Sequence, residues 1–144
     1  MDAKICAPSS PYAAAGHVIT YALPDGWQVL VGRTDAENDY LSFRIARSED
    51  WWFHVRGMPG SHVILQGPAG ADADRQTLTR AAAIAAYHSK ARHAGVVPVS
   101  GTHARDVTKP RGAPAGTVQI RHERVFKVRP ARGEVTAEPG YTSG

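Results

Sequence analysis

Residues 51–66 read WWFHVRGMPGSHVILQ, and this stretch decides the predicted fold. Side chains of a strand point alternately to opposite faces. The first six residues therefore predict one face with Trp51, Phe53 and Val55 and another with Trp52, His54 and Arg56. We expect the first face to be core and the second to be exposed. The corner Gly57–Gly60 then breaks the chain, and His62–Gln66 resumes it as a second strand.

The preceding residues predict a β-hairpin. Two β-rich runs, His17–Tyr21 and Trp27–Val31, flank Pro24–Gly26. Proline presets φ for a turn and glycine accepts a positive φ, so this tripeptide is typical of a hairpin connection. The next apolar run, Tyr40–Ile45, predicts either a strand or a short helix, because its periodicity fits both.

An alanine-rich helix is predicted after residue 73, from about Thr77 to His93. Thr77 is its expected N-cap, and Gly95 ends it. Short strands are expected at Val96–Val99, Thr117–Ile120 and Val125–Val128, and the stiff basic loop Lys109–Gly116 lies between two of them. Many strands with one strong helix indicate an α+β fold, in which a mixed or antiparallel sheet is covered by one main Ala-rich helix at about residues 77–93.

Length and composition indicate one globular domain. The chain has 144 residues, of which 42% are hydrophobic and 21% charged, which excludes collagen-like and wholly disordered chains. We expect a disordered leader at residues 1–15, a domain at 16–130 and a flexible tail at 131–144. No apolar run is long enough for a membrane span, no signal peptide is visible, and Cys6 is the single cysteine. We therefore expect a cytoplasmic protein without a membrane partner.

Charge divides the sequence into two unequal halves. Residues 1–72 have a net charge of −3, whereas residues 73–144 have a net charge of +7. Twelve lysines and arginines lie between residues 75 and 132, opposed there only by Asp106 and Glu123. Such a surface suits an anionic partner. Cations that bind a phosphate backbone, together with an aromatic ring such as Trp52 for the bases, are typical of RNA recognition.

A hydrolase site and a metal site are two weaker alternatives to RNA binding. Ser61 as a nucleophile, with His54 or His62 as base and Asp39 or Asp50 as orienting acid, would make a hydrolase, but Gly60-Ser61-His62 lacks the second glycine of a nucleophile elbow. The seven histidines include no HExxH or 2-His-carboxylate spacing. We therefore expect no enzyme activity, no cofactor and no metal. A general DNA-binding protein stays open as an alternative, because phosphates dominate affinity for both nucleic acids.

Seven sequence elements in one order resemble the NFACT-R domain of the NEMF/RqcH ribosome quality-control family. They are Val31-Gly32-Arg33, Asn38-Asp39-Tyr40-Leu41, Asp50–Arg56, Pro59–Leu65, Ala81–Lys90, Val97-Pro98-Val99 and Val107–Ala113. The resemblance runs from about Gly26 to Pro130. It implies a noncatalytic RNA-binding module whose partner is tRNA or ribosomal RNA, with the large ribosomal subunit as a further partner.

The resemblance also implies a set of RNA contacts. Its long members carry other domains that these 144 residues do not include, so we expect a stand-alone RNA-binding domain rather than a chain that tails stalled peptides by itself. The candidate RNA-binding residues are Arg33, Asn38, Asp39, Trp52, His54, Arg56, Gly60, Ser61, His62, Lys90, Lys109 and Arg111.

Overall fold

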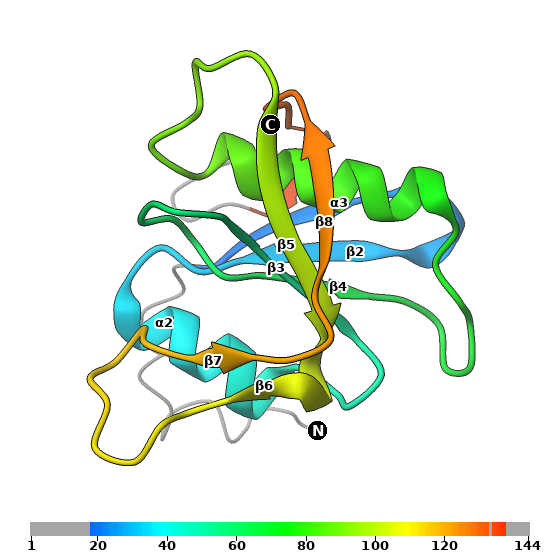
Figure 1. Ribbon diagram of the computed structural model, residues 1–144. Coiled ribbons are helices and arrows are strands. Elements are labelled where there is room, and N and C mark those ends of the chain that lie inside the picture. Colours follow the sequence, from blue (N-terminus) through cyan, green and yellow to red (C-terminus); the bar gives the residue numbers. More distant parts are fainter. Residues whose placement is uncertain (1–17, 133, 138–144) are drawn as a thin grey trace.

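The computed structural model describes residues 18–132 and 134–137, and its main feature is a seven-stranded antiparallel sheet (Figure 1). The strand order is β8-β5-β3-β4-β2-β1-β9. These strands are β1 (Ile19–Ala22), β2 (Gln28–Val31), β3 (Trp51–Val55), β4 (Val63–Gln66), β5 (Val97–His103), β8 (Arg124–Val128) and β9 (Glu134–Ala137). The other elements are η2 (Pro24–Gly26), α2 (Asp35–Tyr40), η3 (Leu41–Ile45), α3 (Arg75–Tyr87), η4 (Ala104–Asp106), β6 (Val107–Thr108) and β7 (Gln119–Ile120).

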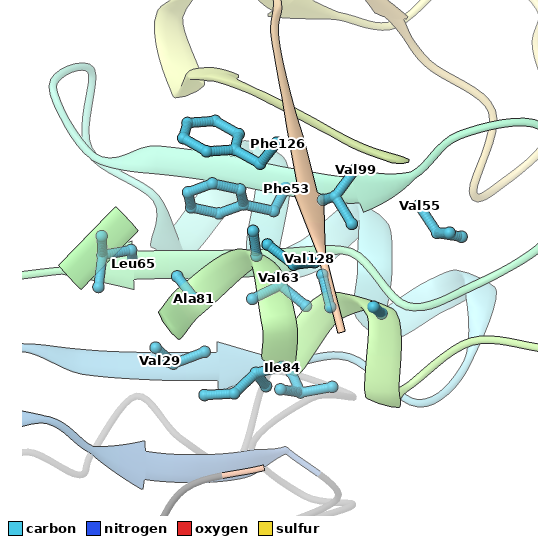
Figure 2. Packing of buried hydrophobic residues seen from close by; sticks show 14 of the residues in the cluster. Val29, Phe53, Val55, Val63, Leu65, Ala81, Ile84, Val99, Phe126 and Val128 are labelled. Atoms are coloured by element: carbon cyan, nitrogen blue, oxygen red, sulfur yellow. The ribbon is translucent and has the colours of Figure 1, made fainter. Parts of the chain in front are cut away.

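Helix α3 covers one face of the sheet and forms the main core with it (Figure 2). Its buried Ala81 and Ile84 belong to the same hydrophobic cluster as Val29, Phe53 and Val63 from the central strands. Small alanine side chains allow the helix to lie close to the sheet, as expected from the sequence. The predicted α+β class, with one main alanine-rich helix on an antiparallel sheet, is confirmed.

The opposite face of the sheet is also covered, which the sequence analysis did not predict. Leu30, Trp52 and Ile64 point from three neighbouring strands into a second, smaller cluster. Leu41 of η3 and Val107 of β6 close this cluster. Apolar residues at consecutive positions of β2 and β4 now have an explanation, since a strand buried on both faces does not alternate. The two clusters are called the main core and the second core below.

Helix α3 begins and ends earlier than predicted. Its N-cap is Asp74, whose carboxylate accepts a hydrogen bond from the Thr77 backbone N–H at 2.8 Å, so the prediction of Thr77 as the cap is wrong. The helix ends at Tyr87, and His88 is its C-cap. Instead of continuing the helix, Ser89 forms an isolated β-bridge and residues 90–93 form turns.

The segment Tyr40–Ile45, for which both a strand and a helix were open, is helical. Thr34 caps α2 by accepting from the Glu37 backbone N–H at 3.1 Å, and Glu37 Oε1 accepts from the Arg33 backbone N–H at 2.8 Å. This reciprocal pair resembles a capping box and fixes the start of the helix. The chain then continues through a π-helical turn, Leu41–Ile45. The hairpin of β1 and β2 around Pro24–Gly26 is as predicted.

The C-terminal strands extend beyond their predicted limits. Strand β5 runs to His103, and the short pair β6–β7 includes Val107–Thr108, which was not predicted as a strand. Strand β9, Glu134–Ala137, pairs with β1 inside the segment predicted to be a flexible tail. The predicted leader lies outside the described residues. Within residues 18–132 and 134–137, no helix combines the length and apolar character that a membrane crossing requires.

Candidate nucleic-acid interface

A basic surface depression of about 420 Å³ lies where β2 ends, β4 begins and α3 ends. Its cations are Arg33, Lys90 and Arg92, which come from two regions far apart in sequence. Two serines, Ser61 and Ser89, add hydroxyl groups. The complete lining is Arg33, Thr34, Asp35, Asn38, Pro59, Gly60, Ser61, His88, Ser89, Lys90 and Arg92. We call this site the basic depression.

Close backbone contact brings the β3–β4 corner to the end of α3. Gly60 forms an isolated β-bridge with Ser89, and the Ser61 backbone N–H donates to the His88 carbonyl at 3.1 Å. A Cβ atom on Gly60 would lie 3.0 Å from Val55 Cγ1 and 3.1 Å from Ser89 Cβ. Glycine thus permits the approach that places Ser61 beside the α3 terminus. The backbone at Gly60 thus approaches the protein itself closely, at the edge of the depression.

The electrostatics of His88 indicate that the depression is positive. Burial is the main cause that lowers the pKa of His88 to about 4, and the nearby charges of Arg92, Arg132 and Arg33 lower it further. The His88 Nε2 atom lies 2.6 Å from Tyr21 Oη. The lining holds the three cations Arg33, Lys90 and Arg92 against the single carboxylate of Asp35, and this balance favours an anionic partner.

Arg92 is held in place by the helix end. Its Nε donates to the Tyr87 carbonyl at 2.9 Å, and its guanidinium lies 4.4 Å from the centre of the Tyr87 ring. Arg92 and His88 were not among the candidate RNA contacts from the sequence. Their position after the last turn of α3 was the available signal, because cations are favoured near a helix C-terminus.

Asn38 lies beneath the depression and orients His62. Asn38 is 6% exposed, and its Oδ1 accepts from the His62 backbone N–H at 3.0 Å. The Gly32 backbone N–H donates in turn to the His62 carbonyl at 3.1 Å. These bonds connect α2 with the end of β2 and the start of β4. Asn38 therefore supports the site by holding the backbone of His62 in place.

Gly32→Ala is expected to lower the free energy of unfolding by about 1–3 kcal/mol, the usual cost of overpacking. A Cβ atom at this position would lie 2.3 Å from Asn38 Oδ1 and 3.1 Å from the Asn38 backbone nitrogen. Urea denaturation followed by circular dichroism measures the effect. Gly95→Ala is the matched control, because a Cβ there meets no atom within 4 Å. Equal destabilisation by the two variants would contradict the proposed crowding at Asn38.

Trp52 is buried in the second core, so the prediction that it is exposed for base stacking is wrong. It is 2% exposed, and its Nε1–H donates to Ser42 Oγ at 3.0 Å. The ring centres of Trp52 and His62 are 5.1 Å apart, and those of Trp52 and His54 are 6.0 Å apart. The alternation of faces was predicted correctly, but α2, η3 and β6–β7 cover the face that was expected to meet solvent.

The rings of His54 and His62 face each other across β3 and the start of β4. Their ring centres are 5.5 Å apart at a perpendicular angle. Burial and the neighbouring His54 lower the pKa of His62 to about 4, against the raising effects of Asp39 and of backbone hydrogen bonds to Asn38 and Gly116. Burial also lowers the pKa of His54. Both rings are therefore neutral at pH 7.

Asp39 and Lys109 pair with each other and anchor the loop of residues 109–116. Lys109 Nζ donates to Asp39 Oδ2 at 2.8 Å and also to the Pro114 carbonyl. The Gly116 backbone N–H donates to Asp39 Oδ1 at 2.9 Å. Lys109 thus holds the loop against α2, whereas Arg111 is exposed on the same loop. Arg56 forms a separate, half-exposed ion pair with Glu123 at 3.5 Å.

The candidate residues therefore divide into groups. Five of them line the basic depression: Arg33, Asn38, Gly60, Ser61 and Lys90. Another three are the neighbouring rings of Trp52, His54 and His62, of which Trp52 belongs to the second core. The remaining four, Asp39, Arg56, Lys109 and Arg111, lie outside the lining of the depression.

The structure does not assemble the Ser61 hydrolase constellation. His62 Nδ1 is hydrogen-bonded to the buried Ser42 Oγ at 3.0 Å, not to Ser61. Asp50 pairs with Arg47 and accepts from Gln66, at the far end of β3 and β4. Across the part of the chain that the structure describes, no group of three or more His, Cys, Asp or Glu side chains is arranged to hold a metal ion.

Comparisons with known proteins agree on one family. A family model described as the NFACT protein RNA binding domain matches residues 17–122. The Rqc2 homolog RqcH of Bacillus subtilis is 40% identical over 111 residues, which cover 77% of this chain and 19% of that protein. The Rqc2 homolog RqcH of Streptococcus suis is 36% identical over 116 residues, which cover 80% of this chain and 21% of that protein.

A solved structure shares the fold. The C-terminal part of the fibronectin/fibrinogen-binding protein from Streptococcus suis superposes with a TM-score of 0.74 at 36% sequence identity. The match covers 80% of this chain and 46% of that chain. The chain spans about a fifth of the length of the curated relatives it matches.

Proposed function

The chain belongs to the NFACT RNA-binding domain family, and we propose that it binds structured RNA through the basic depression. The observation that carries this proposal is the convergence of Arg33, Lys90 and Arg92 around one hollow of about 420 Å³. Arginine and lysine neutralise phosphates, and this electrostatic contribution dominates most nucleic-acid affinity. The Ser61 hydroxyl adds an uncharged donor for a phosphate or ribose oxygen, whereas the Ser89 hydroxyl already donates to the Ala86 carbonyl at 2.6 Å.

The same proposal names the class of RNA and the setting. We take tRNA or ribosomal RNA as the target, in ribosome-associated quality control, with the large ribosomal subunit as the assembly that presents it. Such targets place the domain in the cytoplasm. The role is that of a noncatalytic binding module, which is supported by the separation of Ser61 from the His62–Ser42 hydrogen bond.

Charge removal at the basic depression tests the proposal. We expect the triple variant Arg33→Gln, Lys90→Gln, Arg92→Gln to reduce the slope of log affinity against log salt by about 2–3, since each phosphate contact contributes about 0.7–0.9. Fluorescence anisotropy with labelled tRNA over a salt series measures this slope. The loss should be similar for unrelated RNA sequences, because phosphate contacts do not read bases.

A matched variant separates site binding from net charge. Arg44, Arg75 and Arg80 are exposed and do not line the depression, so their triple replacement by glutamine removes the same charge elsewhere. We expect it to leave most of the salt slope intact. Equal losses in the two triple variants would argue against the depression as the binding site. Equal competition by matched RNA and DNA duplexes would favour a general nucleic-acid binder, because only RNA offers 2′-OH contacts.

A further inference from the structure

A second cavity, of about 440 Å³, lies at the other end of the sheet from the basic depression. This cavity lies where β2 and β3 begin and where β4 and β5 end. Its lining includes Trp27, Trp51, His103 and the loop Gly67–Ala73. Helix α3 has 13 residues and therefore spans about 20 Å between the two sites. We call this second site the aromatic cavity. Its volume falls within the range of small-molecule clefts, about 300–1,000 Å³.

One wall of the aromatic cavity is a platform of stacked rings on the sheet. Trp51 is half-buried, and its ring centre lies 4.4 Å from that of His103, its partner across β3 and β5. Phe53 lies behind Trp51 with nearly parallel rings 6.0 Å apart. A Cβ atom on Gly101 would lie 2.8 Å from Phe53 and Phe126, so glycine makes the space for this aromatic layer.

The opposite wall of the aromatic cavity consists of Trp27 and the loop that begins at Gly67. The Trp27 ring lies directly against the backbone of Gly67, where a Cβ atom would be 2.4 Å from the ring. The loop that follows has small, exposed residues, Ala69, Gly70 and Ala71, which leave the cavity open. A flat group can thus enter between an indole platform and a loop with little side-chain bulk.

The charges around the aromatic cavity favour a neutral ring over a phosphate. Asp50 is neutralised by Arg47 at 3.2 Å, and Glu49 by Arg105 at 2.6 Å. Asp72 adds one exposed carboxylate on the loop. Among the described contacts, the cation over the Trp51 ring is Arg124, whose guanidinium lies 5.7 Å from the ring centre and outside the lining of the cavity. An aromatic face beside an arginine is the arrangement on which unpaired bases stack.

We propose that the aromatic cavity receives an unstacked nucleobase, with Trp51 as the stacking surface. The proposal rests on the proposed function, because the base belongs to the same RNA whose phosphates meet the basic depression. The partly buried Trp51 takes the role that the sequence suggested for Trp52. The two sites then bind different parts of the RNA. Cations at one end of α3 bind the RNA phosphates, and the Trp51 ring at the other end stacks on a base.

The test compares two RNA hairpins that differ only in a short single-stranded extension, which carries either bases or abasic nucleotides. Stacking of one base is worth about 1–3 kcal/mol, so the intact chain should bind the base-containing RNA about 5-fold to 150-fold more tightly. In Trp51→Ala we expect this preference to fall close to 1. Affinity for the abasic RNA and the salt slope should stay unchanged.

Two further variants keep the test decisive if Trp51→Ala folds poorly. Ala71→Trp adds a bulky ring to an exposed loop position, fills the cavity without touching either core, and should abolish the same preference. Phe43→Ala removes an exposed ring from η3 on the other face and should keep the preference.

The outcomes separate this proposal from the function on which it rests. Tight binding of both hairpins without a base preference overturns the base site and leaves the phosphate site standing. A preference that survives in Trp51→Ala and Ala71→Trp also overturns the base site, and leaves the cavity to another partner such as a protein side chain. No binding of either hairpin overturns both proposals.

Discussion

Trp52→Ala is expected to lower the free energy of unfolding by about 3–5 kcal/mol, the usual cost of truncating a large aromatic residue in a core. The side chain is 2% exposed and belongs to the second core with Leu41 and Ile64. Truncation also removes the Nε1–H that donates to Ser42 Oγ at 3.0 Å. Ser42 would then lose one of two buried partners, and His62 would lose the ring packed on its edge.

Urea denaturation followed by circular dichroism measures this change. Trp52→Phe keeps most of the ring and loses the indole hydrogen bond, so it should cost less than alanine. Phe43→Ala removes an aromatic ring that is 36% exposed, and most surface substitutions change stability by less than about 0.5 kcal/mol. Normal stability of Trp52→Ala together with lost RNA binding would mean that this face is open to RNA after all.

The alternation in β3 was sufficient to separate two faces but not to say what each face meets. Phe53 and Val55 are fully buried under α3, as the pattern predicted. The other face was taken as exposed because His54 and Arg56 are polar. Its cover comes from α2, η3 and β6–β7, which are separate in sequence and join only in the folded chain. Consecutive apolar residues in Val63–Leu65 were the available signal for burial on both faces.

Several residues of the candidate site were named from the sequence, but the contact that brings them together was not predicted. The resemblance supplied Arg33 and the sequence predicted a glycine corner that includes Gly60, and both residues line the depression. The contact that creates the depression is the packing of that corner on Ser89 and His88. This packing depends on where α3 ends, and the predicted helix continued to His93. A helix through Ser89 and Arg92 would have directed these side chains elsewhere, so the error in one boundary concealed Arg92.

Lys109 is a candidate RNA contact whose actual partner could not be predicted from the sequence. Its sequence neighbours Pro110 and Arg111 suggest an open basic loop. The partner that occupies it, Asp39, lies 70 residues earlier and is brought near by the packing of α2 on the sheet. Long-range ion pairs of this kind have no local sequence signal. Arg111 is exposed on the same loop, and its contact with RNA stays a prediction.

Acidification is expected to destabilise the fold through His62. Its pKa is about 4 in the folded chain, because the ring is buried and His54 lies beside it, and 6.5 is its ordinary value. Between these two values the unfolded chain binds more protons than the folded chain, so stability falls as the pH falls. This contribution is complete above about pH 6.5. It decreases by about 2 kcal/mol at pH 5 and by about 3 kcal/mol near pH 4.

His88 and His54 also lower the stability of the fold as the pH falls, since burial lowers the pKa of both. His88 differs because the cations Arg33, Arg92 and Arg132 also oppose its protonation. A phosphate bound in the basic depression would offset those charges and make a protonated His88 less costly. RNA should therefore weaken the part of the acid sensitivity that comes from His88, whereas the buried His62 keeps its part.

Urea denaturation between pH 7 and pH 5 measures the effect before most carboxylates are protonated. His62→Asn removes the titrating ring and can keep a hydrogen bond to Ser42, so its stability should depend less on pH than that of the unchanged chain. His93→Asn makes the same replacement at an exposed site and controls for the substitution itself. An equal loss of stability on acidification in His62→Asn and in the unchanged chain would show that the buried His62 does not carry this sensitivity. The acid sensitivity would then come from His88 or His54.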